Sequence, residues 1–249
     1  MRKRILITGA SSGLGAEMAR QWAAKGRDLA LCARRVDRLE ELRDEIRAAH
    51  PGVQVAIRAL DVDDHDAVFR VFRELSDELG GLDRVVVNAG LGKGAAIGTG
   101  KFYANRETAM TNFVSGLAQC EAAMELFRAQ NAGHLVVISS LSAKRGLPHP
   151  LTTYSATKIG IAQLAEGIRI DVMNTPIKVT TIFPGYIASE MNDRATQRKV
   201  MMAPTNVGTR ALVAAVERER KEAIVPAWPW IAMGFVMAHA PEGVIRKFL

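Results

Sequence analysis

Residues 8–15 of the chain read TGASSGLG, and they follow the apolar run Ile5-Leu6-Ile7. The apolar run predicts a buried strand, and the residues beyond the last glycine have helical spacing, so this stretch is a strand-to-helix turn. Its glycines permit close backbone approach, and the unpaired amides of a helix N-terminus favour a phosphate group. The sequence therefore predicts phosphate contacts from the turn, at Gly9, Ser11, Ser12, Gly13, Leu14 and Gly15. A flexible turn without a ligand is the alternative interpretation.

The same alternation of strand and helix continues along the chain. Strands are expected at 3–8, 28–33, 53–59, 82–87, 133–139, 177–183 and 222–225. Helices are expected at 13–25, 36–49, 63–79, 106–130, 152–173 and 206–218. Continuous apolar runs indicate strands buried on both faces, as in a parallel sheet. The predicted fold class is α/β, a doubly wound (Rossmann-like) parallel sheet of about seven strands with helices on both faces.

Composition narrows the class of protein. The 249 residues are 48% hydrophobic, which fits one domain over 1–249, with 186–205 and 226–249 as substrate-loop and tail regions. The net charge is +7, but the basic residues are interleaved with 26 acidic ones, a pattern typical of a solvated surface and not of nucleic-acid binding. Two cysteines predict a reducing, cytoplasmic location, and the dispersed histidines predict no metal site.

Two arginines follow the second expected strand, in LALCARR. Ligands of an open parallel sheet bind at the carboxyl ends of its strands. Asp28 has about the chain spacing of an NAD-binding carboxylate, but it begins the strand. Arg34 and Arg35 end it, and a guanidinium there favours a ribose 2′-phosphate. The sequence therefore predicts NADP as cofactor, with Arg34 as the leading contact. Two solvated arginines at a helix start are the alternative.

A serine pair ends the fifth expected strand, and Tyr154 and Lys158 lie one helical turn apart in the next helix. A tyrosine can donate a proton to a carbonyl oxygen, and a neighbouring cation lowers its pKa from about 10. Ser140 can hydrogen-bond the same oxygen. This grouping predicts a catalyst of carbonyl and alcohol interconversion. An ordinary exposed helix face is the alternative for Tyr154 and Lys158.

The glycine turn also matches G-x-S-x-G, the nucleophile elbow of serine hydrolases, with Ser11 as nucleophile. Such an enzyme needs a histidine, and His149 or His239 is the candidate. Neither follows an expected strand. An elbow this early in the chain also has no preceding sheet to place oxyanion donors. A serine hydrolase is therefore the disfavoured alternative.

Four motifs occur in one order that resembles the short-chain dehydrogenases/reductases. They are TGxxxGxG at 8–15, NAG at 88–90, Tyr154-x-x-x-Lys158, and PGYIAS at 184–189. The resemblance covers residues 3 to about 190 and implies an NADP(H)-dependent oxidoreductase. It implies Tyr154 as acid/base, Lys158 as holder of the nicotinamide ribose and Ser140 as partner of the substrate carbonyl. Asn112 would support a proton-relay water. Further cofactor contacts are implied at Asp61, Val62, Asn88, Ala89, Gly90, Pro184, Gly185, Ile187 and Ser189.

Three of these assignments have alternatives. Asn112 is equally explained as a satisfied core amide. Asp61 could cap the next helix, although Asp63 or Asp64 fits that role better. Ser140 lies 14 positions before Tyr154, where many relatives have 13, so Ser139 or Ser142 are the other candidates.

The tail carries no formal charge from Ala223 to Ala240. Pro226 and Pro229 break this segment and leave about a dozen apolar helical residues, too few to span a bilayer. Its apolar residues are expected to line a pocket, form an interface or make a peripheral membrane contact; they are Trp228, Trp230, Ile231, Phe235, Val236 and Met237. The tail resembles those of relatives that reduce lipid or steroid ketones, which implies a small apolar carbonyl or alcohol substrate.

Two expectations concern assembly and function class. Helices 106–130 and 152–173 are long enough to form a homo-oligomer interface. A non-catalytic NADP(H)-binding regulator is the alternative function. It is disfavoured because Tyr154 and Lys158 are both present.

Overall fold

The computed structural model describes residues 2–188 and 202–248. Within these residues seven strands form one parallel sheet in the order β3-β2-β1-β4-β5-β6-β7. The strands are β1 Arg4–Thr8, β2 Asp28–Ala33, β3 Val55–Ala59, β4 Arg84–Val87, β5 Gly133–Ile138, β6 Ile177–Pro184 and β7 Glu222–Val225. Strand order reverses between β1 and β4, so a crevice is expected beyond their carboxyl ends.

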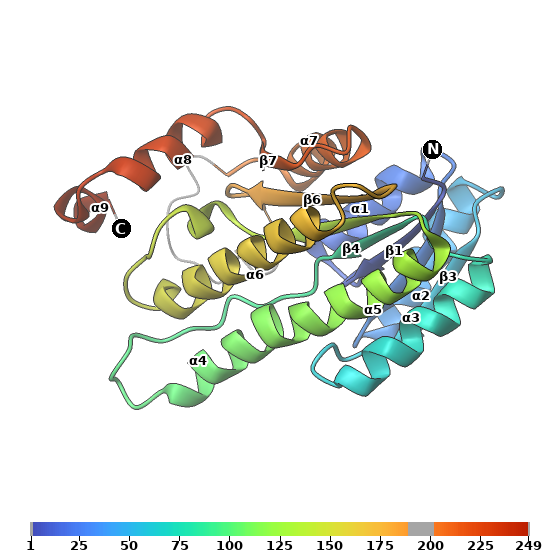
Figure 1. Ribbon diagram of the computed structural model, residues 1–249, viewed down its shortest axis with the longest axis horizontal. Helices are drawn as coiled ribbons and strands as arrows, with labels where there is room; N and C mark the ends of the chain where they lie inside the picture. Colours follow the sequence, from blue (N-terminus) through green and yellow to red (C-terminus); the bar gives the residue numbers. More distant parts are fainter. Residues whose placement is uncertain (1, 189–201, 249) are drawn as a thin grey trace.

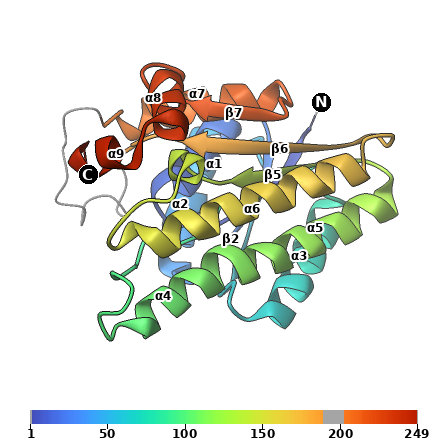
Figure 2. The same cartoon turned by 60° about the vertical axis from the view of Figure 1, so that its left-hand side comes forward.

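Helices cover both faces of the sheet (Figures 1 and 2). They are α1 Gly13–Ala23, α2 Val36–Ala49, α3 His65–Leu79, α4 Phe102–Ala109, α5 Ser115–Gln130, α6 Leu151–Asp171, α7 Thr205–Glu217, α8 Trp230–His239 and α9 Glu242–Phe248. Helices α1, α2 and α7 pack on one face, and α3, α5 and α6 on the other. The doubly wound parallel fold expected from the sequence is confirmed.

Alternate residues of β1 contribute to the two cores. Ile5 and Ile7 pack with α1 and α2, whereas Leu6 packs with α3 and α5, and all three are fully buried. Successive strand residues point to opposite faces, so a strand buried on both sides needs an uninterrupted apolar run. This explains why the apolar runs of the sequence predicted the strands well.

The helix expected at 106–130 differs from the structure. Helix α4 begins earlier, at Phe102, and a π-helical turn at Met110–Val114 separates it from α5. The three segments still form one continuous rod beside α6 (Figure 2). A single π turn changes the apolar spacing by one residue, too little for a periodicity argument to detect. This turn contains Asn112.

The tail forms two helices where one was expected. Helix α8 covers ten residues, and α9 follows it after Pro241. The carboxyl end of β6 points toward the side of the molecule where α8 lies (Figure 1). The tail therefore lies at the carboxyl edge of the sheet.

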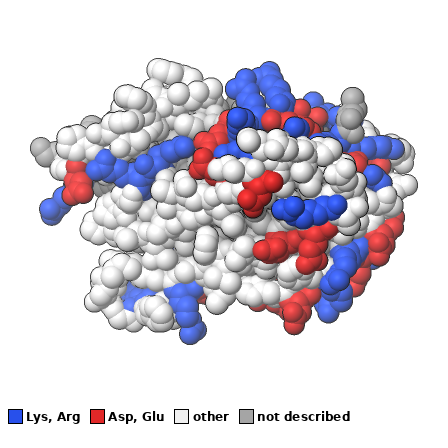
Figure 3. Space-filling model, viewed as in Figure 1, with Lys and Arg blue, Asp and Glu red and all other residues white. Residues whose placement is uncertain are grey.

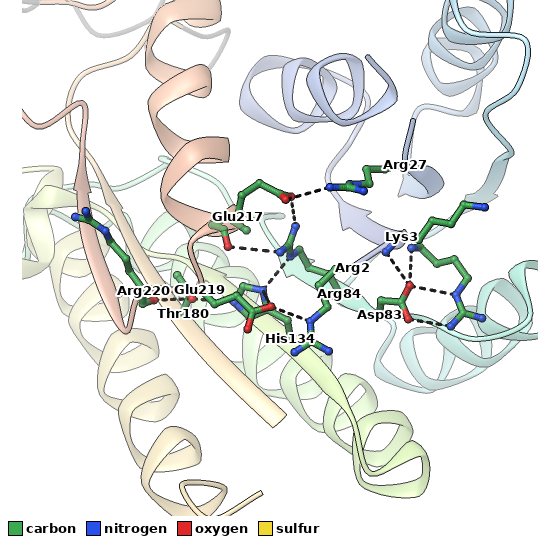
Figure 4. A network of polar contacts seen from close by, with 12 residues as sticks. Arg2, Lys3, Arg27, Asp83, Arg84, His134, Thr180, Glu217, Glu219 and Arg220 are labelled. Atoms are coloured by element: carbon green, nitrogen blue, oxygen red, sulfur yellow. Dashed lines mark hydrogen bonds and ion pairs between the residues drawn. The ribbon is translucent and has the colours of Figure 1, made fainter. Parts of the chain in front are cut away.

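A polar network fastens the opposite, amino-terminal edge (Figure 4). Arg84 at the start of β4 is 1% exposed; its Nε donates to His134 Nδ1 at 2.9 Å, and its guanidinium pairs with Glu217 of α7. His134 Nε2 lies 2.8 Å from Thr180 Oγ1 on β6. These contacts join three strands to α7 at the edge away from the glycine turn.

Candidate active site

The backbone of the glycine turn has a conformation that requires glycine. Gly9 and Gly13 have φ angles of 65° and 53°, in the left-handed region that side chains disfavour. A Cβ on Gly15 would lie 2.3 Å from the carbonyl oxygen of Gly9. The turn and the helix start are therefore in contact, and backbone atoms form the surface here.

The N-terminus of α1 suits a phosphate. Among the described side chains none caps its first turn, and that turn holds no acidic residue. Its first amides thus lack intrahelical partners, and the helix dipole favours negative charge there. The cradle fits the pyrophosphate of a dinucleotide, so the predicted turn contacts are well placed to hold one.

Thr8 and Asn88 join the ends of β1 and β4. Thr8 Oγ1 accepts hydrogen bonds from the backbone N–H groups of Asn88 and Ala89, both at 3.0 Å. The Asn88 side-chain amide donates to the Thr8 carbonyl at 2.8 Å. The NAG segment is therefore fixed against the glycine turn at the reversal of strand order.

The two arginines after β2 lie in different surroundings. Arg35 donates to Ser12 Oγ at 2.7 Å and to Ser11 Oγ at 3.3 Å. Arg34 is 71% exposed, and its guanidinium lies 3.9 Å from the Asp61 carboxylate. The structure therefore brings both arginines to the carboxyl edge of the sheet.

The acidic segment after β3 has separate roles for its carboxylates. Asp64 is the N-cap of α3 and accepts from the Ala67 N–H at 3.0 Å. Asp63 accepts from Ser115 Oγ at 2.6 Å. Asp61 is left exposed at the end of β3, so helix capping does not explain it.

The three candidate serines are separated by their hydrogen bonds. Ser139 is buried and donates to the Lys158 carbonyl at 2.7 Å, away from the Tyr154 hydroxyl. Ser140 is the serine whose hydroxyl acts to lower the pKa of Tyr154. Ser142 donates twice to Ser140 Oγ, from its hydroxyl at 2.8 Å and from its N–H at 3.2 Å. A hydroxyl has two acceptor sites, so with both occupied by Ser142 the one proton of Ser140 is left available to donate. The geometry favours Ser140 over its neighbours.

Asn112 binds the backbone that follows the NAG segment. Its Oδ1 accepts from Leu91 N–H and its Nδ2 donates to the Leu91 carbonyl, both at 2.8 Å. Nδ2 also donates to Thr157 Oγ1 of α6 at 3.3 Å. A Cβ on Gly90 would lie 3.0 Å from Asn112 Oδ1 and 3.5 Å from Lys158 Nζ. Asn112 thus acts as a satisfied core amide and also lies beside Lys158.

Lys158 is buried, and its ammonium donates to the Ile138 carbonyl at 3.1 Å. Burial lowers the pKa of Lys158 to about 8. Burial raises the pKa of Tyr154, the Ser140 hydrogen bond opposes this, and the Tyr186 phenol adds to it; the net direction is upward. The expected net lowering of the Tyr154 pKa is not seen in this structure, because burial has the largest effect on it. The ammonium lies 5.8 Å from the ring centroid and is directed to a carbonyl.

The tail closes over the end of β6. Trp230 of α8 is 2% exposed, and a Cβ on Gly185 would lie 2.4 Å from its ring. The ring of Tyr186 meets Trp230 edge-on, with centroids 5.5 Å apart. Tyr186 thus packs against the tail, and its phenol acts to raise the pKa of Tyr154.

The remaining predicted cofactor contacts lie near this edge. Val62 and Ile187 are buried, and Ile187 pairs with Ala203 through an isolated bridge. Pro184 is the last residue of β6. Ser189 lies outside the described residues.

Sequence reasoning missed Leu91, Thr157 and Tyr186. The first two contact Asn112 through backbone or hydroxyl atoms, which leave no mark in a motif. Tyr186 had a signal: it directly follows Pro184-Gly185 at a strand end, where residues face the crevice.

The hydrolase interpretation is not supported. Ser11 Oγ accepts from Arg35, and among the described residues no histidine contacts it. His239 instead bonds the Phe235 carbonyl of its own helix. The base that a serine nucleophile requires is therefore missing from this position.

Comparison with known proteins identifies the family. The sequence model described as short chain dehydrogenase matches residues 3–200. The chain belongs to this family. An uncharacterised oxidoreductase of Mycobacterium tuberculosis is 50% identical to this short-chain dehydrogenase over 247 residues, covering 99% of the chain and 97% of the relative. A protein of Arabidopsis thaliana named 11-beta-hydroxysteroid dehydrogenase 1A is 30% identical and is matched over 91% of this chain and 69% of its own length.

Solved structures share the fold of this short-chain dehydrogenase. An alcohol dehydrogenase of Thermococcus sibiricus, complexed with 5-hydroxy-NADP, matches with a TM-score of 0.81 at 24% identity, over 96% of this chain and 99% of its own. A family member from Burkholderia phymatum in complex with NAD matches with a TM-score of 0.84 at 19% identity, over 94% and 92%. The two chains bind different nicotinamide cofactors, so fold alone does not select between them.

Two further features are absent from the residues that the structure describes. None of their helices combines the length and apolar character needed to cross a membrane. Nor do they contain a cluster of three or more histidine, cysteine or acidic side chains arranged to bind a metal ion.

Proposed function

We propose that this short-chain dehydrogenase interconverts an apolar carbonyl compound and its secondary alcohol with NADP(H), using Tyr154 as acid/base. The observation that carries the proposal is the grouping of Ser140, Tyr154 and Lys158 at the same sheet edge as the glycine turn. The nicotinamide would supply or accept hydride. The chain's own residues manage the oxygen and its proton.

In reduction, Tyr154 donates its proton to the carbonyl oxygen as negative charge develops there. Its raised pKa keeps it protonated at neutral pH. Ser140 donates a second hydrogen bond to that oxygen, because Ser142 occupies its acceptor sites. Lys158, when charged, stabilises the phenolate that remains. Asn112 positions the loop at Leu91 and the start of α6, and thereby Lys158.

NADP is proposed over NAD because of the arginines after β2. Arg34 is the leading contact for the 2′-phosphate. Arg35 follows it and hydrogen-bonds the serines of the glycine turn, so it is the second basic residue beside the proposed phosphate position. Asp61 lies beside Arg34, where it can meet the adenine. Family structures in complex with NADP⁺ and with NADPH are consistent with this preference.

The molecule is proposed to act as one unit over 1–249, with 186–205 and 226–249 at the substrate. Trp230 and Tyr186 form an aromatic wall on the substrate side, and the hydroxysteroid dehydrogenase among the relatives supports an apolar substrate.

The cysteines are buried and unpaired, which supports a cytoplasmic location.

Exposed apolar side chains support a homo-oligomer. They lie along α4, the π turn and α6 at Phe102, Tyr103, Met110, Phe113 and Ile159. The surface over these helices is largely uncharged (Figure 3). A second copy of the chain is the proposed occupant of this face.

The test is NADPH oxidation with a panel of apolar ketones, in wild type and Tyr154→Phe. We expect turnover by the wild type, and a rate of NADPH oxidation at least about a hundredfold lower in the variant. NADPH binding should persist in the variant, since the glycine turn is intact. Activity that survives Tyr154→Phe would refute the mechanism. Cofactor binding without turnover of any ketone by the wild type would favour the regulator.

A further inference from the structure

Helix α8 is apolar on both of its faces. Its inner face carries Trp230 against Gly185, and Gly234, where a Cβ would lie 3.0 Å from Leu141 Cδ1. Its outer face, together with the residue two positions before the helix, exposes large apolar side chains: Trp228 is 81%, Ile231 56%, Phe235 67% and Val236 50% exposed. We call these four residues the α8 surface.

A helix on the surface of a globular protein normally turns polar residues to solvent. Helix α8 has one polar side chain, His239, whose ring lies 4.4 Å from that of Phe235, and the sequence carries no formal charge from 223 to 240. Contiguous exposed apolar patches of this kind mark interaction sites. Among the described residues of α8, the buried ones are Trp230 and Gly234 of the inner face, so packing within the described part of the chain does not explain the outer face.

Basic side chains lie at the carboxyl end of α8 and on the helix that follows it. Arg145 donates to the Ala240 carbonyl at the end of α8, and Arg246 is exposed on α9. From 223 onward the sequence contains Arg246 and Lys247 but only one acid, Glu242. Figure 3 shows the uncharged area over α8 with mostly blue and some red side chains along its lower edge. An apolar face with a cationic rim complements an anionic lipid surface.

We propose that the α8 surface docks on an anionic phospholipid bilayer, with α8 lying in the plane of the interface. Tryptophan suits this position because it has an apolar body and one polar N–H group. Helix α8 has ten residues, so it lies on the membrane and does not cross it. Its inner face covers Gly185 and Tyr186, so docking brings the candidate site next to the bilayer. The delivery of an apolar substrate by this route rests on the proposed function, but docking itself does not.

A second copy of the chain fits the α8 surface less well. Its four side chains expose roughly 500 Å², whereas a stable interface buries about 800 Å² on each partner. Helix α8 lies at the upper left of the molecule in Figure 1, with α9 beyond it at that end.

The experiment is co-sedimentation of the full chain with vesicles of phosphatidylcholine, alone or mixed with phosphatidylserine. We expect the wild type to sediment with the mixed vesicles, and less so at high salt. Trp228→Ser combined with Phe235→Ser should lower the partition coefficient at least about tenfold. Arg246→Glu should weaken binding to the mixed vesicles and leave binding to neutral ones unchanged.

The matched control is Ile170→Ser with Met173→Ser. These residues are 61% and 70% exposed; Ile170 lies in the last turn of α6, and Met173 lies two residues beyond its end. This variant should bind vesicles like the wild type. Circular dichroism and the thermal midpoint should match among all variants, because the substituted side chains face solvent.

Three results would overturn the proposal: no sedimentation of the wild type, equal binding by the Trp228/Phe235 variant, or a dimer that this variant dissociates without any lipid binding. The last result would assign the α8 surface to a second copy. NADPH oxidation with the panel of apolar ketones, measured on the same proteins without vesicles, reports on the proposed function separately. Its absence would refute the enzyme and leave the vesicle result standing.

Discussion

The indole ring of Trp230 packs directly on the backbone of Gly185, so closely that a Cβ there would lie 2.4 Å from the ring. Gly185→Ala must therefore displace α8. We expect a loss of about 1–3 kcal/mol in the free energy of unfolding, the usual cost of overpacking. The KM for an apolar ketone should also rise, because Tyr186 loses its edge-on partner. Urea denaturation and steady-state kinetics measure the two effects.

Gly167→Ala is the control, because a Cβ there meets nothing within 4 Å. This residue lies in α6, so the control should gain about 0.5–1 kcal/mol. Adding Trp230→Phe to Gly185→Ala should recover part of the lost stability. Unchanged stability and KM in Gly185→Ala would show that the tail does not support the site.

The second prediction separates the arginines after β2. Arg34→Ala should raise the KM for NADPH roughly tenfold to a hundredfold, the worth of a hydrogen bond to a charged group, and leave the KM for NADH unchanged. Arg35→Ala should raise the KM for both NADPH and NADH, because Arg35 also binds Ser11 and Ser12 of the glycine turn. Arg43→Ala is the control, since Arg43 pairs only locally with Asp44 among the described residues. An unchanged NADPH preference in Arg34→Ala would defeat the assignment.

The third prediction concerns the pH dependence of reduction. Burial lowers the pKa of Lys158 to about 8. Its charge, which supports the developing phenolate, is thus present below about pH 8 and lost above it. We expect kcat/KM for a ketone to fall as pH rises through about 8. Tyr154 stays protonated in this range because its pKa is raised.

Lys158→Arg provides the comparison. Its guanidinium stays charged, so its lower rate should show no fall near pH 8. A wild-type profile that is flat between about pH 7 and pH 9 would contradict the role given to Lys158. So would the same fall in Lys158→Arg.

The fold was predictable because it depends on patterns that sequence carries directly. The run Ile5-Leu6-Ile7 fills two cores at once, and only a strand between two helical layers needs that. The π turn at Asn112 and the helix α9 were not predictable in this way. The first adds one residue to one turn, and the second is a seven-residue helix, shorter than periodicity can establish.

Parts of the site were predictable for the same reason. Parallel strands end at one edge, so Gly9, Arg34 and Ser140 had to meet there. The choice of Ser140 over Ser139 needed the structure, because it depends on which hydroxyl binds the Lys158 carbonyl. The direction in which the pKa of Tyr154 is shifted also needed the structure. Sequence places a cation one turn away, but only the structure shows burial and the ammonium bonded to Ile138.

The last prediction concerns stability in acid, through His134 at the amino-terminal edge (Figure 4). Thr180 donates its hydroxyl proton to the Arg220 carbonyl, so His134 Nε2 must donate to Thr180, and Nδ1 accepts from Arg84. A proton on Nδ1 would face the Arg84 N–H. Burial, with Arg84 and Arg2, lowers the pKa of His134 well below its ordinary value.

The folded protein therefore resists a proton that the unfolded chain takes up below about pH 6.5. The stability that comes from neutral His134 is present above that pH and is lost as pH falls, with a slope of up to about 1.4 kcal/mol per pH unit.

In His134→Asn the amide can still accept from Arg84, but the Thr180 bond is lost, so stability should drop by about 1 kcal/mol at neutral pH. The change in the free energy of unfolding per pH unit, between about pH 6.5 and pH 5, should become smaller by the amount that His134 contributes in the wild type. Urea denaturation across this range measures both, with the exposed His149→Asn as control. A slope in His134→Asn equal to that of the wild type would place the acid sensitivity elsewhere.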